Sequence, residues 1–277
     1  MATDHSERTG PTTETADGGT AVVPWYRQTK SFARRSLREL ARSRVALFWA
    51  ILWPVFWYFL TMVVFISEPQ GVPESQLPAV MADIRATNAI SFGLFGAFTV
   101  TLVAFAQNFT DDLEAKRYRK LRSLPIAPSA DLTGRFLAGF VLALASFWTV
   151  VGVGYLDGAS FALADGALSI VVVLVSLLLF CIVGMSTAVV FSTVVEKGEY
   201  LTIVTNTTLL ILFFSTGYNG IQAAMSPMRE YVNLVPNSLA ARMQIYHLTD
   251  VRGQAAEQAG LVSPALPGDP RFLALLL

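Results

Sequence analysis

Residues 45–66 read VALFWAILWPVFWYFLTMVVFI, a run of 22 residues without a charged side chain. A helix of about 20 apolar residues crosses the hydrocarbon core of a bilayer. A transmembrane β-strand needs only about ten residues and alternates apolar with polar positions, which this run does not do. The run therefore predicts a membrane-spanning helix, and Pro54 predicts a kink that neighbouring helices can tolerate.

Four further runs have the same character. They are residues 86–110, 136–156, 167–195 and 200–217, and the run at 167–195 is long enough to tilt or to break near Gly184. Residues 271–277 look like the start of a sixth span, so we expect a chain truncated within it. The predicted fold is an all-α membrane protein, a polytopic helical bundle with five full spans plus the start of a sixth. Residues 25–277 would form this transmembrane domain, and 1–24 a disordered polar tail.

The composition excludes several classes of protein. Of 277 residues, 14% are charged and 53% are hydrophobic, whereas a soluble protein has about 25% charged residues. An ordinary soluble enzyme and a mostly disordered chain are both excluded. The net charge of zero provides no field for nucleic acid. One cysteine and two distant histidines predict neither an internal disulfide nor a metal site.

The basic residues indicate the orientation. With five spans, fifteen of the 20 Lys and Arg residues gather at one end of the bundle and five at the other. The positive-inside rule places the N-terminus and residues 111–135 in the cytoplasm, and the acidic, proline-rich segment 67–83 outside. Arginine far outnumbers lysine, which points to a prokaryotic source and therefore to its cell membrane.

Residues 30–44 have the pattern of an amphipathic helix. At 100° per residue, apolar side chains cover one half of the helical wheel and arginines cover the other. Such a helix lies in the membrane interface against anionic lipid headgroups. We expect an elbow that positions the first span; the alternative is a simple orientation signal. The apolar half holds Phe32, Ala33, Leu37, Leu40 and Ala41, and the basic half Arg34, Arg35, Arg38 and Arg42.

The segment 111–136 reads DDLEAKRYRKLRSLPIAPSADLTGRF, with acidic residues first and basic residues after them. This order complements a helix dipole and predicts a short cytoplasmic helix near 112–124. Pro125 and Pro128 would stop it, and Asp131 would cap the next helix. One side carries an apolar stripe of Leu113, Tyr118, Leu121 and Leu124 that a partner would cover. The alternative is again a basic orientation signal alone.

This segment resembles the first cytoplasmic loop of type-2 ABC exporter permeases. In that family an acidic residue comes first. A basic helix follows it, then a Leu/Pro motif ending in (Val/Ile)-(Ser/Ala)-Pro, and then the next span. This chain has Glu114, a basic helix and LPIAP at 124–128. The family often has Arg-Glu-Arg-Gly-Thr where residues 113–117 read Leu-Glu-Ala-Lys-Arg. The resemblance implies a coupling helix that docks on a cytosolic ABC ATPase subunit through Glu114, Arg117, Tyr118, Leu121, Leu124, Pro125 and Pro128.

A second resemblance lies after the fifth run. Residues 218–240 are too polar to cross a membrane and too apolar for a free loop. They resemble the extracellular re-entrant helices of the same family, which would cap the translocation path. The alternative is an outer loop lying on the headgroups. The residues that carry this gate prediction are Pro227, Leu234, Pro236 and Asn237.

The chain has no energy source of its own. It contains no GxxxxGK[ST] phosphate loop and no HExxH motif, and no nucleophile, base or metal set converges. The five predicted spans hold no charged residue, which argues against proton coupling. We therefore expect no enzymatic activity and no cofactor in this chain, with ATP and magnesium held by the partner subunit.

Polar residues inside the spans are the candidates for a transport path. In the family, the first, second and fifth spans border the path between two permease subunits, so the resemblance implies a lining role. The alternative is hydrogen bonding between helices, worth about 0.6 kcal/mol each. The candidates are Ser91, Thr99 and Thr101 in the second run and Thr202, Thr205, Asn206 and Thr208 in the fifth.

The sequence predicts the permease subunit of an ATP-driven ABC exporter that moves an amphiphilic or hydrophobic substrate out of the cytoplasm. Its expected partners are the ATPase subunit, a second permease subunit in a homo- or heterodimer, and membrane lipid. The rival is a non-transporting membrane scaffold or sensor whose basic loop binds lipid or a soluble regulator. The sequence leaves the substrate open.

Overall fold

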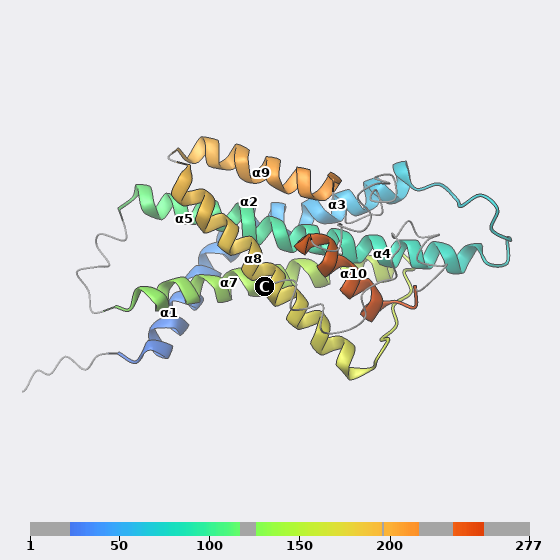
Figure 1. The fold of residues 1–277 in the computed structure, drawn as a ribbon, viewed down its shortest axis with the longest axis horizontal. Helices are drawn as coiled ribbons and strands as arrows, with labels where there is room; N and C mark the ends of the chain where they lie inside the picture. The colour runs from blue at the N-terminus through green and yellow to red at the C-terminus, as the bar shows by residue number, and fades with distance from the viewer. Residues whose placement is uncertain (1–22, 117–125, 196, 216–234, 252–277) are drawn as a thin grey trace, which may run out of the picture.

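The computed structural model describes residues 23–116, 126–195, 197–215 and 235–251, so the predicted tail at 1–24 lies almost wholly outside it. The described part is built from helices and contains no strand (Figure 1). The all-α fold class predicted from the sequence is therefore confirmed.

The first apolar run is one continuous helix with two wider turns. We call it the first helix, and it follows the amphipathic α1 in the chain. It comprises α2 (Arg44–Leu47), η1 (Phe48–Leu52), α3 (Trp53–Leu60) and η2 (Thr61–Phe65), where η marks π-helical geometry. Pro54 has no N–H to donate, and the π-helical turn directly before it lets the helix continue. The disturbance expected at Pro54 thus takes the form of a change in helix type.

A single long helix runs through the middle of the bundle (Figure 1). It consists of α4 (Leu77–Phe98), η3 (Thr99–Ala104) and α5 (Phe105–Glu114), and residues 86–103 are buried on every side. A helix that is apolar or small all round is expected at the centre of a bundle. It exceeds the predicted span at 86–110 at both ends. Pro78, in its first turn, starts the helix inside the segment predicted as an outer loop.

Four more helices pack around this centre. They are α7 (Pro128–Leu156), α8 (Ala167–Val194), α9 (Gly198–Ser215) and the short α10 (Pro236–Leu248). Helix α7 packs along α4, and α10 packs on α8 and α4. We call the end with Lys116 and Arg135 the basic end of the bundle, and the end with Tyr58 and Asp157 the far end.

In the described part of the chain, four helices are long and apolar enough to cross a membrane: Phe48–Phe65, Leu77–Glu114, Pro128–Leu156 and Ala167–Val194. The protein is therefore a multi-pass membrane protein. The fifth predicted span forms α9, whose apolar part Gly198–Phe213 is shorter than these four, so a full fifth crossing stays a prediction. The predicted start of the sixth span at 271–277 lies outside the described residues.

The amphipathic helix predicted at 30–44 is α1 (Trp25–Arg42). Its arginines are exposed, while Phe32, Leu37 and Leu40 are half-buried. It begins five residues earlier than predicted because its first turns are anchored to α7. Trp25 Nε1 donates to Ser129 Oγ at 3.1 Å, and the Ala127 N–H donates to Gln28 Oε1 at 3.0 Å. Its elbow role at a membrane surface stays a prediction.

Helix α8 shows no break at Gly184, contrary to one of the alternatives weighed from the sequence. It is continuous from Ala167 to Val194. A Cβ at position 184 would lie 2.5 Å from Thr101 Oγ1 and 3.2 Å from Phe98 Cδ2. Glycine is there because α8 and the central helix touch at this point, and close backbone approach is a common use of glycine in membrane helices.

Polar contacts hold the far end together. Tyr58 Oη donates to Asp157 Oδ2 at 2.8 Å, and Arg85 Nε lies 3.4 Å from the same oxygen. The buried His247 at the end of α10 has its Nδ1 3.2 Å from Ser169 Oγ at the start of α8. The first helix, the central helix and α7 therefore meet at one carboxylate, and α10 is tied to α8 beside it.

The contact between α1 and α7 generates a test. A Cβ at Gly134 would lie 2.6 Å from Phe32 Cβ and 2.8 Å from the Ala33 nitrogen. Gly134→Ala should therefore force the two helices apart and lower the free energy of unfolding by about 1–3 kcal/mol. Thermal unfolding of the detergent-purified protein measures this.

The matched control is Gly152→Ala on the same helix, where a Cβ would meet nothing within 4 Å. This change should leave stability unchanged or raise it by up to about 1 kcal/mol. Equal melting of both variants would show that α1 and α7 are not in close contact.

Candidate functional site

A cavity of about 420 Å³ opens near the basic end between three helices. It lies between the start of the first helix, the η3–α5 part of the central helix, and α9. We call it the larger cavity. Its lining combines apolar, amide, hydroxyl and aromatic side chains with one charged residue: Ser43, Val45, Trp49, Ala50, Thr99, Val100, Val103, Ala104, Gln107, Asn108, Asp111, Thr202 and Asn206.

Helical periodicity brings these residues together. Val100, Val103, Ala104, Gln107 and Asp111 recur at spacings of three and four residues, so they share one stripe of the central helix. Thr202 and Asn206 are four residues apart and share one face of α9. The stripe is apolar at 100–104 and polar from 107 onward, so the cavity becomes more polar towards the basic end.

Three of the seven residues predicted to line a path do line this cavity: Thr99, Thr202 and Asn206. Each donates a side-chain hydrogen to a backbone carbonyl of its own helix. Thr99 Oγ1 donates to the Phe95 carbonyl at 2.8 Å, Thr202 Oγ1 to Gly198 at 3.1 Å, and Asn206 Nδ2 to Thr202 at 2.8 Å. The hydroxyl lone pairs and the amide oxygen are the groups these residues can present to a ligand.

The other four lie elsewhere. Ser91, Thr101 and Thr205 are buried and donate to backbone carbonyls of their own helices at 2.8–3.0 Å. Thr101 faces Gly184 of α8, and Thr208 is half-buried on α9. Their geometry suits helix packing, and a role in a transport path stays a prediction for all seven.

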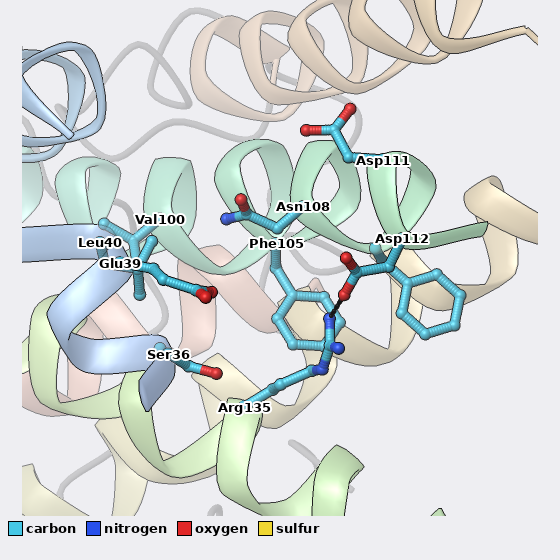
Figure 2. A pocket seen from close by; sticks show the side chains of 11 residues that line it. Ser36, Glu39, Leu40, Val100, Phe105, Asn108, Asp111, Asp112 and Arg135 are labelled. Atoms are coloured by element: carbon cyan, nitrogen blue, oxygen red, sulfur yellow. Dashed lines mark ion pairs between the residues drawn. The ribbon is translucent and has the colours of Figure 1, made fainter. Parts of the chain in front are cut away.

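A smaller cavity of about 170 Å³ lies next to the larger one, between α1, α5 and α7 (Figure 2). Arg135 of α7 reaches across it and pairs with Asp112 of α5, and Arg135 Nε also lies 3.0 Å from Asp131 Oδ2. Both Asp112 and Asp131 are buried. Buried charges are stable only when paired, so this cluster ties the last turn of α5 to the first turns of α7.

Asp111 lies next to this cluster but points away from it. In Figure 2 the Asp112 carboxylate faces Arg135, whereas the Asp111 carboxylate is directed to the other side of the helix. Asp111 is exposed and borders both cavities. Glu39, the other acidic residue of the smaller cavity, pairs with Arg35 at 2.8 Å, and this hydrogen bond raises the pKa of Arg35.

The helix predicted near 112–124 does not begin where the sequence suggested. Asp112 and Glu114 form the last turn of α5, and the chain leaves the helix at Ala115. Lys116 follows with a φ of 52°, and its N–H donates to the Leu113 carbonyl at 3.0 Å. Lys116 therefore holds the left-handed position that closes many helices and that favours glycine. The family pattern places its glycine at this same position.

Two more residues of the predicted coupling segment are placed. The Glu114 side chain lies beside the start of α9, since a Cβ at Gly198 would be 3.4 Å from Glu114 Oε1; a negative charge is favourable at the N-terminus of a helix. Pro128 is the first residue of α7, a common place for proline, so Asp131 is not the predicted cap. The remaining predicted contacts lie outside the described residues: Arg117, Tyr118, Leu121, Leu124 and Pro125.

The predicted gate falls on the start of α10. Pro236 is its first residue, and the buried Asn237 donates through Nδ2 to the Leu212 carbonyl of α9 at 3.0 Å. Pro227 and Leu234 lie outside the described residues. At 13 residues α10 is about 20 Å long, too short to cross a bilayer. It is a buried helix at the far end, and its gate function stays a prediction.

Sequence reasoning missed two features of the site. Asp111 was taken only as dipole compensation, although its spacing from Gln107 and Asn108 marks a polar stripe. The pairing of Asp112 with Arg135 joins residues 23 positions apart, and no local pattern indicates it. Within the described ranges, no group of three His, Cys, Asp or Glu side chains is placed to hold a metal ion.

The comparison with known proteins adds one finding. Residues 27–243 match the model of a family described as ABC-2 type transporter. This range takes in nearly all of α1, the apolar helices, both cavities and the larger part of α10. No curated protein matches the chain.

The ion-pair cluster can be tested by replacement. Arg135→Met leaves Asp112 buried without this partner and should lower the free energy of unfolding by about 3 kcal/mol. The double variant Asp112→Asn with Arg135→Met also removes the Asp112 charge and should recover part of that loss, while the buried Asp131 still lacks Arg135. Chemical or thermal unfolding in detergent gives both values. If the double variant is less stable than Arg135→Met alone, the two side chains do not act as a pair.

The left-handed position at 116 gives a second test. Lys116→Gly removes the steric cost of φ at 52° and should raise the free energy of unfolding by up to about 1 kcal/mol. Lys116→Ala is the matched control, because it removes the same charge but keeps a Cβ. A gain in both variants would trace the effect to charge rather than to backbone geometry.

Proposed function

This chain belongs to the ABC-2 type transporter family and is a permease subunit of an ABC transporter, and from that premise we propose that it is an exporter. In this proposal it moves an amphiphilic or hydrophobic substrate out of the cytoplasm with energy from ATP hydrolysed on a separate subunit. The observation that carries the proposal is the larger cavity near the basic end, bordered by the first helix, the central helix and α9.

The position of the cavity supports a role in transport. These three helices correspond to the first, second and fifth apolar runs, which border the path in the exporters that the sequence resembles. The cavity combines an apolar wall at Val100 and Val103 with hydroxyl and amide groups at Thr202 and Asn206. Such a mixed lining suits a molecule with an apolar body and a polar group.

The contacts at the basic end support a mechanism of coupling. In the proposal, the coupling segment from Glu114 to Pro128 docks on an ABC ATPase subunit, which alone binds ATP and magnesium. Arg135 ties the helix before this segment to the helix after it. Glu114 lies beside the start of α9. A push on the segment would therefore move α5 and α7 together and displace α9, which forms one wall of the cavity.

The proposed arrangement in the membrane follows from charge. The basic end, with α1 and the segment after α5, would face the cytoplasm of a prokaryotic cell, and the arginines of α1 would contact anionic lipid. A second permease subunit, identical or different, would complete the path. Helix α10 would close it at the far end, where Asn237 holds α10 to α9.

The coupling segment provides the test of the proposal. When the chain is expressed with its ABC ATPase subunit, Glu114→Ala and Leu121→Asp should each reduce co-purification of the ATPase by at least about tenfold, because each removes a central contact of the interface. Insertion into the membrane should be unchanged, as measured by the yield of folded protein in detergent.

Glu68→Ala at the far end is the control, because it removes an exposed acidic residue from the opposite side of the bundle. If both variants keep the ATPase and its stimulated turnover, the segment is not the coupling element. If the unaltered chain retains no ATPase and moves no substrate in vesicles, the membrane scaffold or sensor is the better description.

A further inference from the structure

The charge that lines the larger cavity is negative. Among the described residues that line it, Asp111 is the only charged one, and none is Lys, Arg or His. Arg135, which lines the adjacent smaller cavity, is engaged by Asp112 and Asp131. Within the described ranges no ion pair involves Asp111, whose carboxylate is directed away from Arg135 (Figure 2).

The rest of the lining suits a cation as well. Trp49 presents an indole ring, whose face attracts positive charge. Hydroxyl and amide oxygens of Thr202 and Asn206 can add further partial negative charge. Val100 and Val103 supply an apolar wall for the body of a ligand. Asp111 lies where this stripe reaches the basic end and borders both cavities, so a charged group at Asp111 leaves room for an apolar body deeper inside.

The same features disfavour other ligands. An anion would meet the Asp111 carboxylate, and no described residue of the wall offers a basic side chain to compensate. A zwitterionic phospholipid would place its phosphate in the same environment. The volume of about 420 Å³ lies within the range of small-molecule pockets, about 300–1,000 Å³.

We propose that the larger cavity selects organic cations with an apolar body, and that Asp111 is the residue that determines this specificity. This inference rests on the proposed function for its role in transport, but binding can be measured without transport. It narrows the substrate class from any amphiphile to a positively charged one.

The test uses a pair of probes that share one shape and differ in the sign of their charge. Tetraphenylphosphonium is a cation and tetraphenylborate is an anion. The full chain is placed in phosphatidylcholine nanodiscs, and binding is measured by equilibrium dialysis with empty nanodiscs subtracted. The cation should bind, the anion should not, and Asp111→Asn should weaken cation binding by about tenfold or more.

Two variants serve as controls. Asp111→Glu keeps the charge and should retain cation binding within about threefold. Glu68→Gln removes an exposed acidic residue at the far end and should have no effect, which separates a local contact from the net charge of the protein. Unchanged melting temperatures of all variants would show that the cavity is still formed.

Several results would overturn the inference: no cation binding to the unaltered chain, equal binding of both probes, or full cation binding by Asp111→Asn. Displacement of the cation by short-chain phosphatidylethanolamine would assign the site to a lipid headgroup instead. These outcomes are independent of the proposed function. If the complex couples to its ATPase while Asp111→Asn binds normally, only this inference fails; if Asp111-dependent binding is found without coupling, only the proposed function fails.

Discussion

This bundle depends on the burial of one long helix within the others. Lipid offers no hydrogen-bond partners to a polypeptide, so each membrane segment must satisfy its backbone as a helix. The helix from Leu77 to Glu114 spans about 57 Å at 1.5 Å per residue. Its residues 86–103 are all buried, so every neighbouring helix is positioned by contact with it. The hydroxyl groups of Thr99 and Thr101 donate to carbonyls of the same helix, which satisfies them without a partner helix.

Ion pairs connect this central helix to α7 at both ends. Asp112 pairs with Arg135 at the basic end, and Arg85 pairs with Asp157 at the far end. Between them the two helices pack along much of their length. Charged groups near the ends of apolar helices avoid the cost of burial in hydrocarbon, and pairing them fixes the register of the two helices.

The larger cavity lies against this paired unit. Its other walls are the start of the first helix and α9. The first helix exposes Phe48, Leu52 and Phe56, and α9 exposes Ile203 and Ile211. These two helices are therefore less enclosed than the centre. The shape of the cavity therefore depends on the positions of these two helices relative to the central helix and α7. Because Glu114 lies beside the start of α9, a movement of the segment after Glu114 would reach the cavity through α9.

Local patterns predicted much of the architecture. The uncharged runs indicated helices because a membrane helix must be apolar for about 20 residues, and the arginine face of residues 30–44 indicated the amphipathic α1. The resemblance around Glu114 and the LPIAP motif named the family correctly. Helix limits were less predictable. The central helix extends back to Leu77, into the segment predicted as an outer loop, because Pro78 in the first turn favours a helix start there.

The amino-acid sequence by itself determined the helical fold and the insertion in a membrane, because both follow from composition and spacing along single helices. It also indicated the family, through the resemblance carried by Glu114 and residues 124–128. Only the tertiary structure decided which polar residues share a cavity. Thr99 and Asn206 are separated by more than 100 positions and meet because α9 lies against η3, whereas Thr101, two residues from Thr99, faces Gly184 in a packed contact. Two residues along a helix differ by a rotation of about 200°, so Thr99 and Thr101 lie on different faces. The positions of the neighbouring helices decide which of these faces forms a wall of the cavity.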